Sequence, residues 1–218
     1  MASRLDALKD TLKGFDSFLD VGTDHAYLPI LALEENPSLK VLASDNKKGP
    51  LEQARLHLAK ANLLNRVSLL LGEGLTVLNE VVDVIVMAGM GGKTIAKMVL
   101  EKKDLSVKRL VCHPTNVPSA VRKLTQLLDY HIADEIFDVE SDVPYTIIIL
   151  EPGQASYTEK ELLYGPILLK KRPKAYLQIL EKEYRFTLGL LDQIPEGAKK
   201  EAFKHQSKLL KEVLDDRS

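Results

Sequence analysis

The chain has 218 residues, of which 45% are hydrophobic, and its formal net charge is −1. That length suits one ordinary domain with an appendage, and a charge near zero does not indicate nucleic-acid binding by the chain as a whole. A single cysteine, Cys112, excludes a disulfide framework and a cysteine-rich zinc site. The sequence shows no apolar run of 18 residues and no signal-peptide core, so we expect a cytoplasmic protein without a membrane partner.

Charge is distributed unevenly along the chain. Residues 1–152 contain 17 Lys and Arg against 21 Asp and Glu, a net charge of −4, whereas residues 153–218 contain 13 against 10, a net charge of +3. A basic C-terminal segment on an acidic body points to a polyanionic partner.

The first 152 residues alternate between strand and helix patterns. After an opening amphipathic helix over 2–13, the strands that we predict are 17–21, 40–44, 67–71, 81–87, 108–112, 131–139 and 145–150. The helices that we predict between them are 26–35, 50–62, with Pro50 as its first residue, 93–101 and 119–128. Five strands that alternate with helices favour a parallel sheet, and the last two, joined by residues 140–144, favour an antiparallel hairpin at one edge. We therefore predict an α/β domain over 1–152 with a seven-stranded Rossmann-like sheet.

The remainder, 153–218, has helical periodicity only. A short helix is expected at 159–170, followed by two helices separated by Ile194-Pro195-Glu196-Gly197. The apolar stripe of the first contains Tyr176, Leu180, Tyr184, Leu188 and Leu191, and that of the second contains Phe203, Gln206, Leu210 and Val213. This pattern predicts a second domain built as a coiled-coil-like helical hairpin.

Polar and glycine-rich segments follow each of the first five predicted strands. Ligands of doubly wound sheets bind outside the carboxyl ends of the strands, so these five segments predict one binding site. In chain order they are Asp20-Val21-Gly22-Thr23-Asp24-His25, Asp45-Asn46, Gly72-Glu73-Gly74, Met87-Ala88-Gly89-Met90-Gly91-Gly92 and His113-Pro114-Thr115-Asn116.

Carboxylates at this edge favour a ligand with hydroxyl groups or an ammonium group over a pyrophosphate, which binds bare backbone N–H groups. Gly22 allows a positive φ and a close approach of the ligand. Asp45 can accept hydrogen bonds from both hydroxyls of a ribose. Glu73 can bind an adenine amino group or remain solvated.

Purely structural roles remain open for several of these residues. Asp45 can be a helix cap or a turn residue, and Asp24 can be the N-cap of the helix that starts at Ala26. His25 can orient its neighbours, and Tyr27 can belong to the core.

Two common nucleotide motifs are absent. A dinucleotide site needs G-x-G-x-x-G, but Asp24 and Tyr27 stand where the second and third glycines belong. Gly92-Lys93-Thr94 matches the end of a phosphate-binding P-loop, but Met87 replaces its first glycine. A ligand with an adenosine, a sulfonium and an amino acid group, S-adenosylmethionine, fits the acidic loop with its single glycine.

Four motifs together resemble the bacterial tRNA (adenine-22-N1)-methyltransferase family: D-V-G-T-D-H-A-Y-L-P at 20–29, G-P-x-x-x-A at 49–54, G-x-G-L at 72–75 and A-G-M-G-G at 88–92. The resemblance covers nearly the whole chain. This chain departs from the family pattern at two places. Where the family commonly has Q-P-N, it has His113-Pro114-Thr115-Asn116, and where Glu often ends the second strand, it has Asp45-Asn46. It also departs near the last strand, where Pro144-Tyr145-Thr146 replaces an aromatic-Tyr-Glu pattern.

The resemblance implies a class I methyltransferase sheet and methyl transfer from S-adenosylmethionine to N1 of an adenosine in tRNA, without a metal. We expect catalytic roles for Asp24, Tyr27 and Asn116. The residues expected around the cofactor are Asp20, Gly22, Thr23, His25, Asp45, Asn46, Gly72, Glu73, Gly74, Ala88, Gly89, Met90 and Gly91. The residues expected to bind the substrate are His113, Lys170, Lys171, Arg172 and Lys174, although the basic run can also be a solvated turn.

Two other functions remain open. The chain can be a catalytically silent RNA- or nucleotide-binding module, or a methyltransferase that acts on a small molecule. The predicted hairpin can grip RNA or form a dimer, and we favour a monomer.

Overall fold

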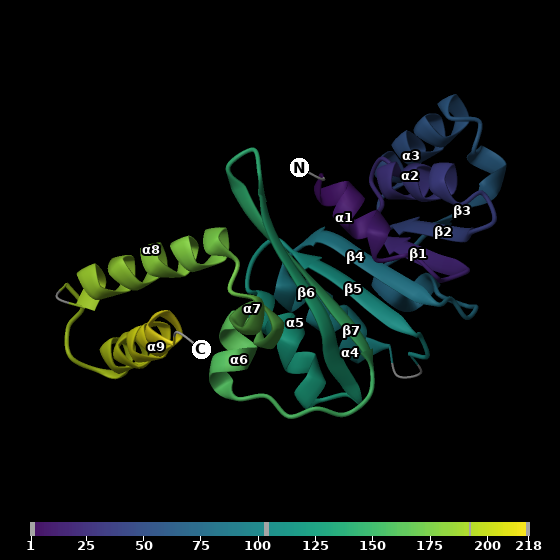
Figure 1. Ribbon diagram of the computed structural model, residues 1–218. Helices are drawn as coiled ribbons and strands as arrows, with labels where there is room; N and C mark the ends of the chain where they lie inside the picture. Colours follow the sequence, from purple (N-terminus) through teal and green to yellow (C-terminus); the bar gives the residue numbers. More distant parts are fainter. Residues whose placement is uncertain (1–2, 103–104, 192, 217–218) are drawn as a thin grey trace.

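The computed structural model describes residues 3–102, 105–191 and 193–216, so the outer ends of both predicted domains and residue 2 of the opening helix lie outside it. Seven strands form one sheet in the order β3-β2-β1-β4-β5-β7-β6 (Figure 1). Their bounds are β1 Ser17–Val21, β2 Lys40–Asp45, β3 Val67–Leu71, β4 Val84–Met90, β5 Arg109–Pro114, β6 Tyr130–Glu140 and β7 Val143–Pro152. The first five strands are parallel, and β7 runs antiparallel to both β5 and β6. The predicted α/β sheet with its edge hairpin is confirmed.

Helices cover both faces of the sheet. They are α1 Arg4–Asp10, α2 Tyr27–Glu35, α3 Lys48–Lys60, α4 Gly92–Glu101 and α5 Pro118–Arg122. Side chains of α1, α2 and α3 pack with Phe18 and Val84 on one face, and those of α4 and α5 pack with Leu19 and Ile85 on the other. Successive strand residues point to opposite faces, so strands covered on both sides are apolar throughout.

Several boundaries differ from the sequence prediction, among them that of the opening helix, which ends at Asp10 rather than at residue 13. The helix expected at 119–128 ends as an α-helix at Arg122 and continues as a 3-10 turn, η3 Lys123–Gln126. The Thr125 hydroxyl donates to the Arg122 carbonyl oxygen at 2.8 Å, a local bond that competes with helical pairing. α3 begins at Lys48, before Pro50, and β4 begins at Val84 rather than at Val81, which is exposed.

The β6–β7 hairpin is longer than predicted. Ser141 and Asp142 alone form its turn, with φ values of 49° and 65°. Two successive positive φ values match the right-handed twist of paired strands, so the ladder extends to the turn itself.

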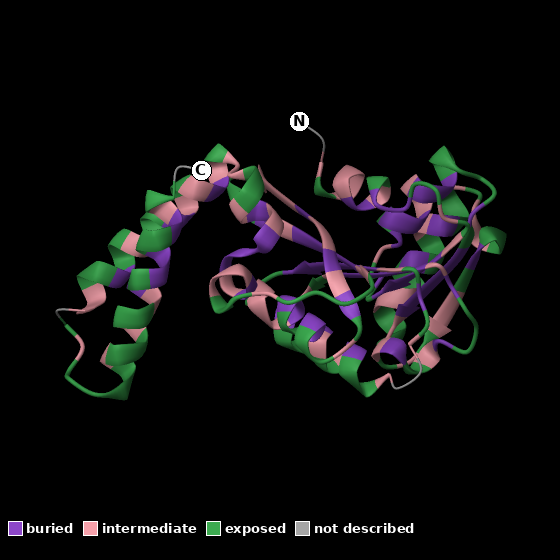
Figure 2. Cartoon of the chain, turned by 60° about the horizontal axis from the view of Figure 1, so that its bottom comes forward, coloured by how far each residue is buried: buried purple, intermediate pink, exposed green. Residues whose placement is uncertain are grey.

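The C-terminal segment is helical, as predicted, but the helix expected at 159–170 is two helices. α6 Glu159–Tyr164 and α7 Pro166–Lys171 meet at Gly165, whose φ is +87°, and Pro166 cannot continue the preceding helix. The long helices α8 Lys174–Leu191 and α9 Ala198–Asp215 follow. Figure 2 shows them mostly exposed, with buried residues on the sides that face each other.

A buried ion pair joins the helical segment to the sheet. The side chains of Arg122 and Glu135 are 1% and 0% exposed, and Arg122 Nε donates to Glu135 Oε1 at 2.7 Å. The other carboxylate oxygen accepts from the Ile167 N–H at 3.0 Å, and Arg122 Nη1 donates to the Leu163 carbonyl oxygen at 2.7 Å. Four elements, α5, β6, α6 and α7, therefore meet at one pair of side chains.

Candidate active site at the carboxyl edge of the sheet

The loop after β1 is fixed by its backbone. The N–H groups of Gly22 and Thr23 both donate to the Ser44 carbonyl oxygen of β2, at 2.8 and 2.9 Å. Gly22 has a φ of +75°, and Asp24 and Ala26 also lie in the left-handed region, at 48° and 56°. The glycine that the sequence analysis required for a turn with positive φ is therefore where it was expected.

Asp20 lies beneath this loop, with only 6% of its surface exposed. The Thr23 hydroxyl donates to its Oδ2 at 2.7 Å. Burial disfavours the charged carboxylate and raises the pKa of Asp20 to about 6, although the Thr23 hydrogen bond opposes the shift. Asp20 therefore supports the loop from inside.

Asp24 does not cap α2. The N-cap position is Ala26, where no side-chain hydrogen bond forms, so the capping role left open above is wrong. The Asp24 side chain is 62% exposed, and its Oδ2 lies 3.4 Å from His25 Nε2. An exposed carboxylate thus stands at the end of β1.

Three rings gather beside Asp24. The centroid of the His25 ring lies 5.3 Å from that of Tyr27 and 5.1 Å from that of His57, and His57 Nδ1 lies 3.1 Å from the His25 carbonyl oxygen. Tyr27 is 50% exposed, so it is not a core residue. His57 comes from the last turn of α3, and the sequence analysis missed it because no motif includes it.

The loops after β2 and β3 lie side by side. Asp45 Oδ1 accepts a hydrogen bond from the Lys47 N–H at 2.9 Å, which is the turn role considered above. The Gly72 N–H donates to the Asp45 carbonyl oxygen at 3.0 Å. Asn46 and Glu73 are exposed, and Gly74 has a φ of +53°.

The ends of β4 and β5 are packed closely. The Gly92 N–H donates to the Asn116 carbonyl oxygen, and the Thr115 N–H donates to that of Met90, at 3.0 and 2.9 Å. A Cβ on Gly92 would lie 2.3 Å from the Val117 carbonyl oxygen, and one on Gly91 would lie 3.2 Å from Asn116 Oδ1. Gly91 and Gly92, which follow Ala88 and Met90 in the A-G-M-G-G motif, therefore let these two loops touch.

His113 is buried behind Gly89. Its Nδ1 lies 3.3 Å from the Gly89 backbone nitrogen, whose N–H donates to it. Burial is the largest of the influences that lower the pKa of His113 to about 4, so the ring is neutral near pH 7 and accepts this bond. Its ring meets that of Tyr145 edge-on, with centroids 6.0 Å apart.

A cavity of about 1020 Å³ continues from this edge toward the helical hairpin. His113 and Asn116 line one end, and α8 and α9 line the other. Neither Asp24 nor Tyr27 lines it, so the rings described above lie outside this cavity.

Half of the predicted basic cluster is engaged within the protein. Lys171 pairs with Asp134 and donates to the Glu135 carbonyl oxygen, and Arg172 Nη1 donates to the Val213 carbonyl oxygen at 3.1 Å. Lys170 and Lys174 are exposed at the corner between α7 and α8.

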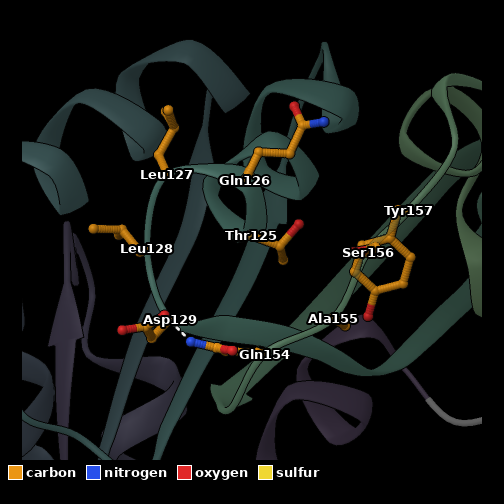
Figure 3. A pocket seen from close by; sticks show the side chains of 9 residues that line it. All are labelled: Thr125, Gln126, Leu127, Leu128, Asp129, Gln154, Ala155, Ser156 and Tyr157. Atoms are coloured by element: carbon orange, nitrogen blue, oxygen red, sulfur yellow. Dashed lines mark hydrogen bonds between the residues drawn. The ribbon is translucent and has the colours of Figure 1, made fainter.

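A second cavity, of about 890 Å³, opens at the opposite edge of the sheet. Figure 3 shows its walls, η3 and the segment after β7, where Gln154 Nε2 donates to Asp129 Oδ1 at 3.0 Å. Tyr130 pairs with Pro152 there, and β7 is antiparallel to β5, so this is the amino edge of the parallel strands. It is separate from the candidate site.

Neither a metal site nor a membrane span is found in the part of the chain that the structure describes. No group of three or more His, Cys, Asp and Glu side chains there is arranged to hold an ion. Likewise, no helix among these residues is long and apolar enough to cross a membrane. Burial raises the pKa of the Cys112 thiol to about 12, which leaves it inert.

The strand order, the antiparallel edge hairpin and the acidic, glycine-rich carboxyl edge define a class I, Rossmann-like methyltransferase. The model of the TrmK family, tRNA (adenine(22)-N(1))-methyltransferase, matches residues 18–216. The chain belongs to this family, as the sequence motifs predicted.

Individual relatives agree with this assignment. The tRNA (adenine(22)-N(1))-methyltransferase of Bacillus subtilis strain 168 is 29% identical over 231 residues, which cover 99% of this chain and 97% of that protein. Sp1610 of Streptococcus pneumoniae is 31% identical, with a TM-score of 0.90 and coverage of 98% of this chain and 99% of that one. Its complex with S-adenosyl-L-methionine matches with a TM-score of 0.88 at 30% identity, over 98% of this chain and 100% of that one.

Proposed function

We propose that this chain transfers the methyl group of S-adenosylmethionine to N1 of the adenosine at position 22 of tRNA. The family match over residues 18–216 carries the proposal. The complex of Sp1610 with S-adenosyl-L-methionine supports the choice of cofactor, because the two chains are similar over nearly their full lengths.

The residues at the carboxyl edge fit this cofactor. Asp45 and Glu73 supply carboxylates, and neither Lys nor Arg is among the thirteen predicted cofactor residues. An added Cβ on Gly89 would meet no heavy atom within 4 Å, and one on Gly22 would meet only the Met90 side chain, at 3.7 Å. The backbone at Gly22 and Gly89 is therefore open to the approach of a positively charged sulfonium.

Each loop has a proposed part of the cofactor to hold. Asp45 and Asn46 bind the ribose hydroxyls. Asp45 would do so through Oδ2, because its Oδ1 already accepts the turn hydrogen bond from Lys47. Glu73, with Gly72 and Gly74, holds the adenine. The remaining contacts come from the loops after β1 and β4, namely Gly22, Thr23, His25, Ala88, Gly89, Met90 and Gly91, with Asp20 supporting from beneath.

Bound S-adenosylmethionine supplies an electrophilic methyl group. N1 of adenine has a lone pair in the plane of its ring and carries no proton near pH 7, so the protein need not supply a general base. Its own task is to align N1 and to stabilise the positive charge that develops on the base.

Three residues perform that task in this proposal. Asp24, exposed at the end of β1, places a negative charge beside the cationic product. Tyr27, held against His25 and His57, presents a half-exposed ring on which an adenine turned out of its stack can rest. Asn116, fixed through Gly92, hydrogen-bonds the edge of the base.

The helical segment is the proposed tRNA clamp. Residues 153–218 would act as a second domain, with Lys170 and Lys174 at the α7–α8 corner on the phosphates. Lys171 and Arg172 have internal partners and would contribute mainly by holding that corner in place.

A methylation assay tests the proposal. The protein is incubated with isotopically labelled S-adenosylmethionine and unmodified tRNA, and the digested nucleosides are separated by mass spectrometry. We expect labelled 1-methyladenosine, no label when position 22 is guanosine, and a loss of about 10- to 100-fold in kcat for Asp24→Asn. Binding of the cofactor or tRNA without any 1-methyladenosine would instead establish the catalytically silent module.

A further inference from the structure

The cavity between the sheet edge and the hairpin is larger than the target base requires. A volume of about 1020 Å³ is at the upper end for a site that encloses a drug-sized ligand. The proposed contacts to the target base from Asp24 and Tyr27 lie outside it. The cavity can therefore hold a further part of the same substrate, next to the target adenosine.

Its walls favour a nucleobase over a phosphate. Four aromatic rings line it, from the half-buried Phe137 and from Tyr145, Tyr164 and Tyr176, which expose only 5–7% of their surface. The wall also contains three glutamates, of which Glu140 is paired with Arg4 and Glu159 with His205. Unstacked RNA bases bind between aromatic rings and polar side chains, whereas a phosphate would meet an excess of negative charge.

Glu183 on α8 is the third glutamate, and its partner is an uncharged amide. Gln206 Nε2 on α9 donates to Glu183 Oε1 at 2.8 Å, which leaves Oε2 outside this hydrogen bond. The carboxyl is half-buried, and burial raises its pKa above the ordinary value. An incompletely desolvated carboxylate held by a neutral partner is free to accept hydrogen bonds from a ligand.

We propose that Glu183, held by Gln206, reads a guanine of the tRNA that enters this cavity beside the target adenosine. Guanine presents two adjacent donors, N1–H and the 2-amino group, which match the two oxygens of one carboxylate. Adenine, cytosine and uracil each present a donor at only one position of the base-pairing edge, so none offers two adjacent donors. This inference rests on the proposed tRNA methyltransferase activity and adds a second base contact to it.

The first test replaces the carboxylate while keeping its shape. For Glu183→Gln we expect kcat/KM for tRNA to fall about 5- to 100-fold, because an NH2 group, itself a donor, replaces one of the two oxygens that accept the guanine donors. Affinity for S-adenosylmethionine, measured by calorimetry, should not change. The matched control is Glu212→Gln, which removes the same charge from an exposed position of α9 outside the cavity. Equal effects of the two variants would overturn the proposal.

The second test changes the RNA and compares tRNAs within each protein, so a uniform loss of activity in the variant does not affect it. Each guanosine near position 22 is replaced in turn by inosine, which lacks the 2-amino group. We expect one replacement to slow the wild-type enzyme several-fold while leaving Glu183→Gln unaffected. If every inosine tRNA slows both proteins alike, no guanine is read by Glu183. If unsubstituted tRNA is not methylated at all, the proposed function itself has failed.

Discussion

The carboxyl edge of the sheet and the helical segment are held in place by different means. At the edge, backbone groups fix the loops: Gly22 and Thr23 bind the Ser44 carbonyl oxygen, and Gly92 binds that of Asn116. In the helical segment, side chains do this work, through the Arg122–Glu135 pair and an apolar cluster of α8 and α9. The edge should therefore be sensitive to backbone conformation, and the hairpin to side-chain chemistry.

The largest effect is expected at the buried ion pair. Glu135→Leu leaves the Arg122 guanidinium buried without its counter-charge and removes the acceptor of the Ile167 N–H. Breaking such a pair costs about 3–5 kcal/mol, which urea unfolding would measure. Because the same pair joins α6 and α7 to the sheet, we also expect a higher KM for tRNA with unchanged cofactor affinity.

A double variant separates stability from hairpin orientation. Replacing both partners, as Arg122→Met with Glu135→Leu, removes the unpaired charge and should recover part of the lost stability. We expect the KM for tRNA to stay raised, because the bonds to Leu163 and Ile167 are still missing. Recovery of the wild-type KM would show that the pair does not orient the hairpin.

A smaller effect on stability is expected at Asp20, where a substitution should stabilise the protein near neutral pH rather than destabilise it. Its pKa is about 6 when folded and 3.8 as a model compound, so the folded state binds the proton more tightly between these values. The contribution of Asp20 to the free energy of unfolding should therefore fall as pH rises from 4 to 6, by about 3 kcal/mol at most. Asp20→Asn keeps an acceptor for Thr23 and should be more stable than wild type at pH 7.5 but not at pH 4. Urea unfolding at both pH values checks this, and equal destabilisation at both would contradict it.

The backbone of the edge is tested at Gly22. Both Gly22→Ala and Gly14→Ala place a side chain at positive φ, +75° and +84°, without a steric clash. Each should cost about 1–2 kcal/mol of stability through the backbone alone. Gly14 lies between α1 and β1, away from the proposed cofactor residues. We therefore expect only Gly22→Ala to weaken cofactor binding in calorimetry, and equal binding by both variants would remove Gly22 from the site.

Much of the edge could be predicted because its signals are local. A buried apolar run followed by Asp20 and Gly22 specifies a strand and a turn with positive φ, and the structure has both. The alternation of strands and helices similarly specified the sheet. Local signals also act in the helical segment, since Gly165-Pro166 explains why residues 159–170 form two helices, α6 and α7.

Contacts between distant segments could not be predicted in this way. His57 joins His25 across 32 positions, and Gln206 meets Glu183 across 23. No pattern marks His57, and the stripe that contains Gln206 does not show which residue of the other helix it contacts. Arg122 and Glu135 are ordinary charged residues in the sequence, and burial alone distinguishes them. Such contacts depend on packing, which periodicity does not encode.

The smallest effect is expected for His113→Gln, which restores the glutamine that is common in the family. A glutamine carbonyl oxygen can accept the Gly89 N–H that Nδ1 accepts now, so kcat/KM should change by less than about threefold. The pKa of His113 is about 4 when folded and 6.5 as a model compound, so the contribution of His113 to stability should fall as pH is lowered from 7 to 4, opposite to that of Asp20. The variant should lose that part of the acid sensitivity, while its activity profile above pH 6 stays the same as that of wild type. A new activity step near pH 6.5 in wild type alone would show that His113 is charged during the reaction, contrary to its buried, accepting role.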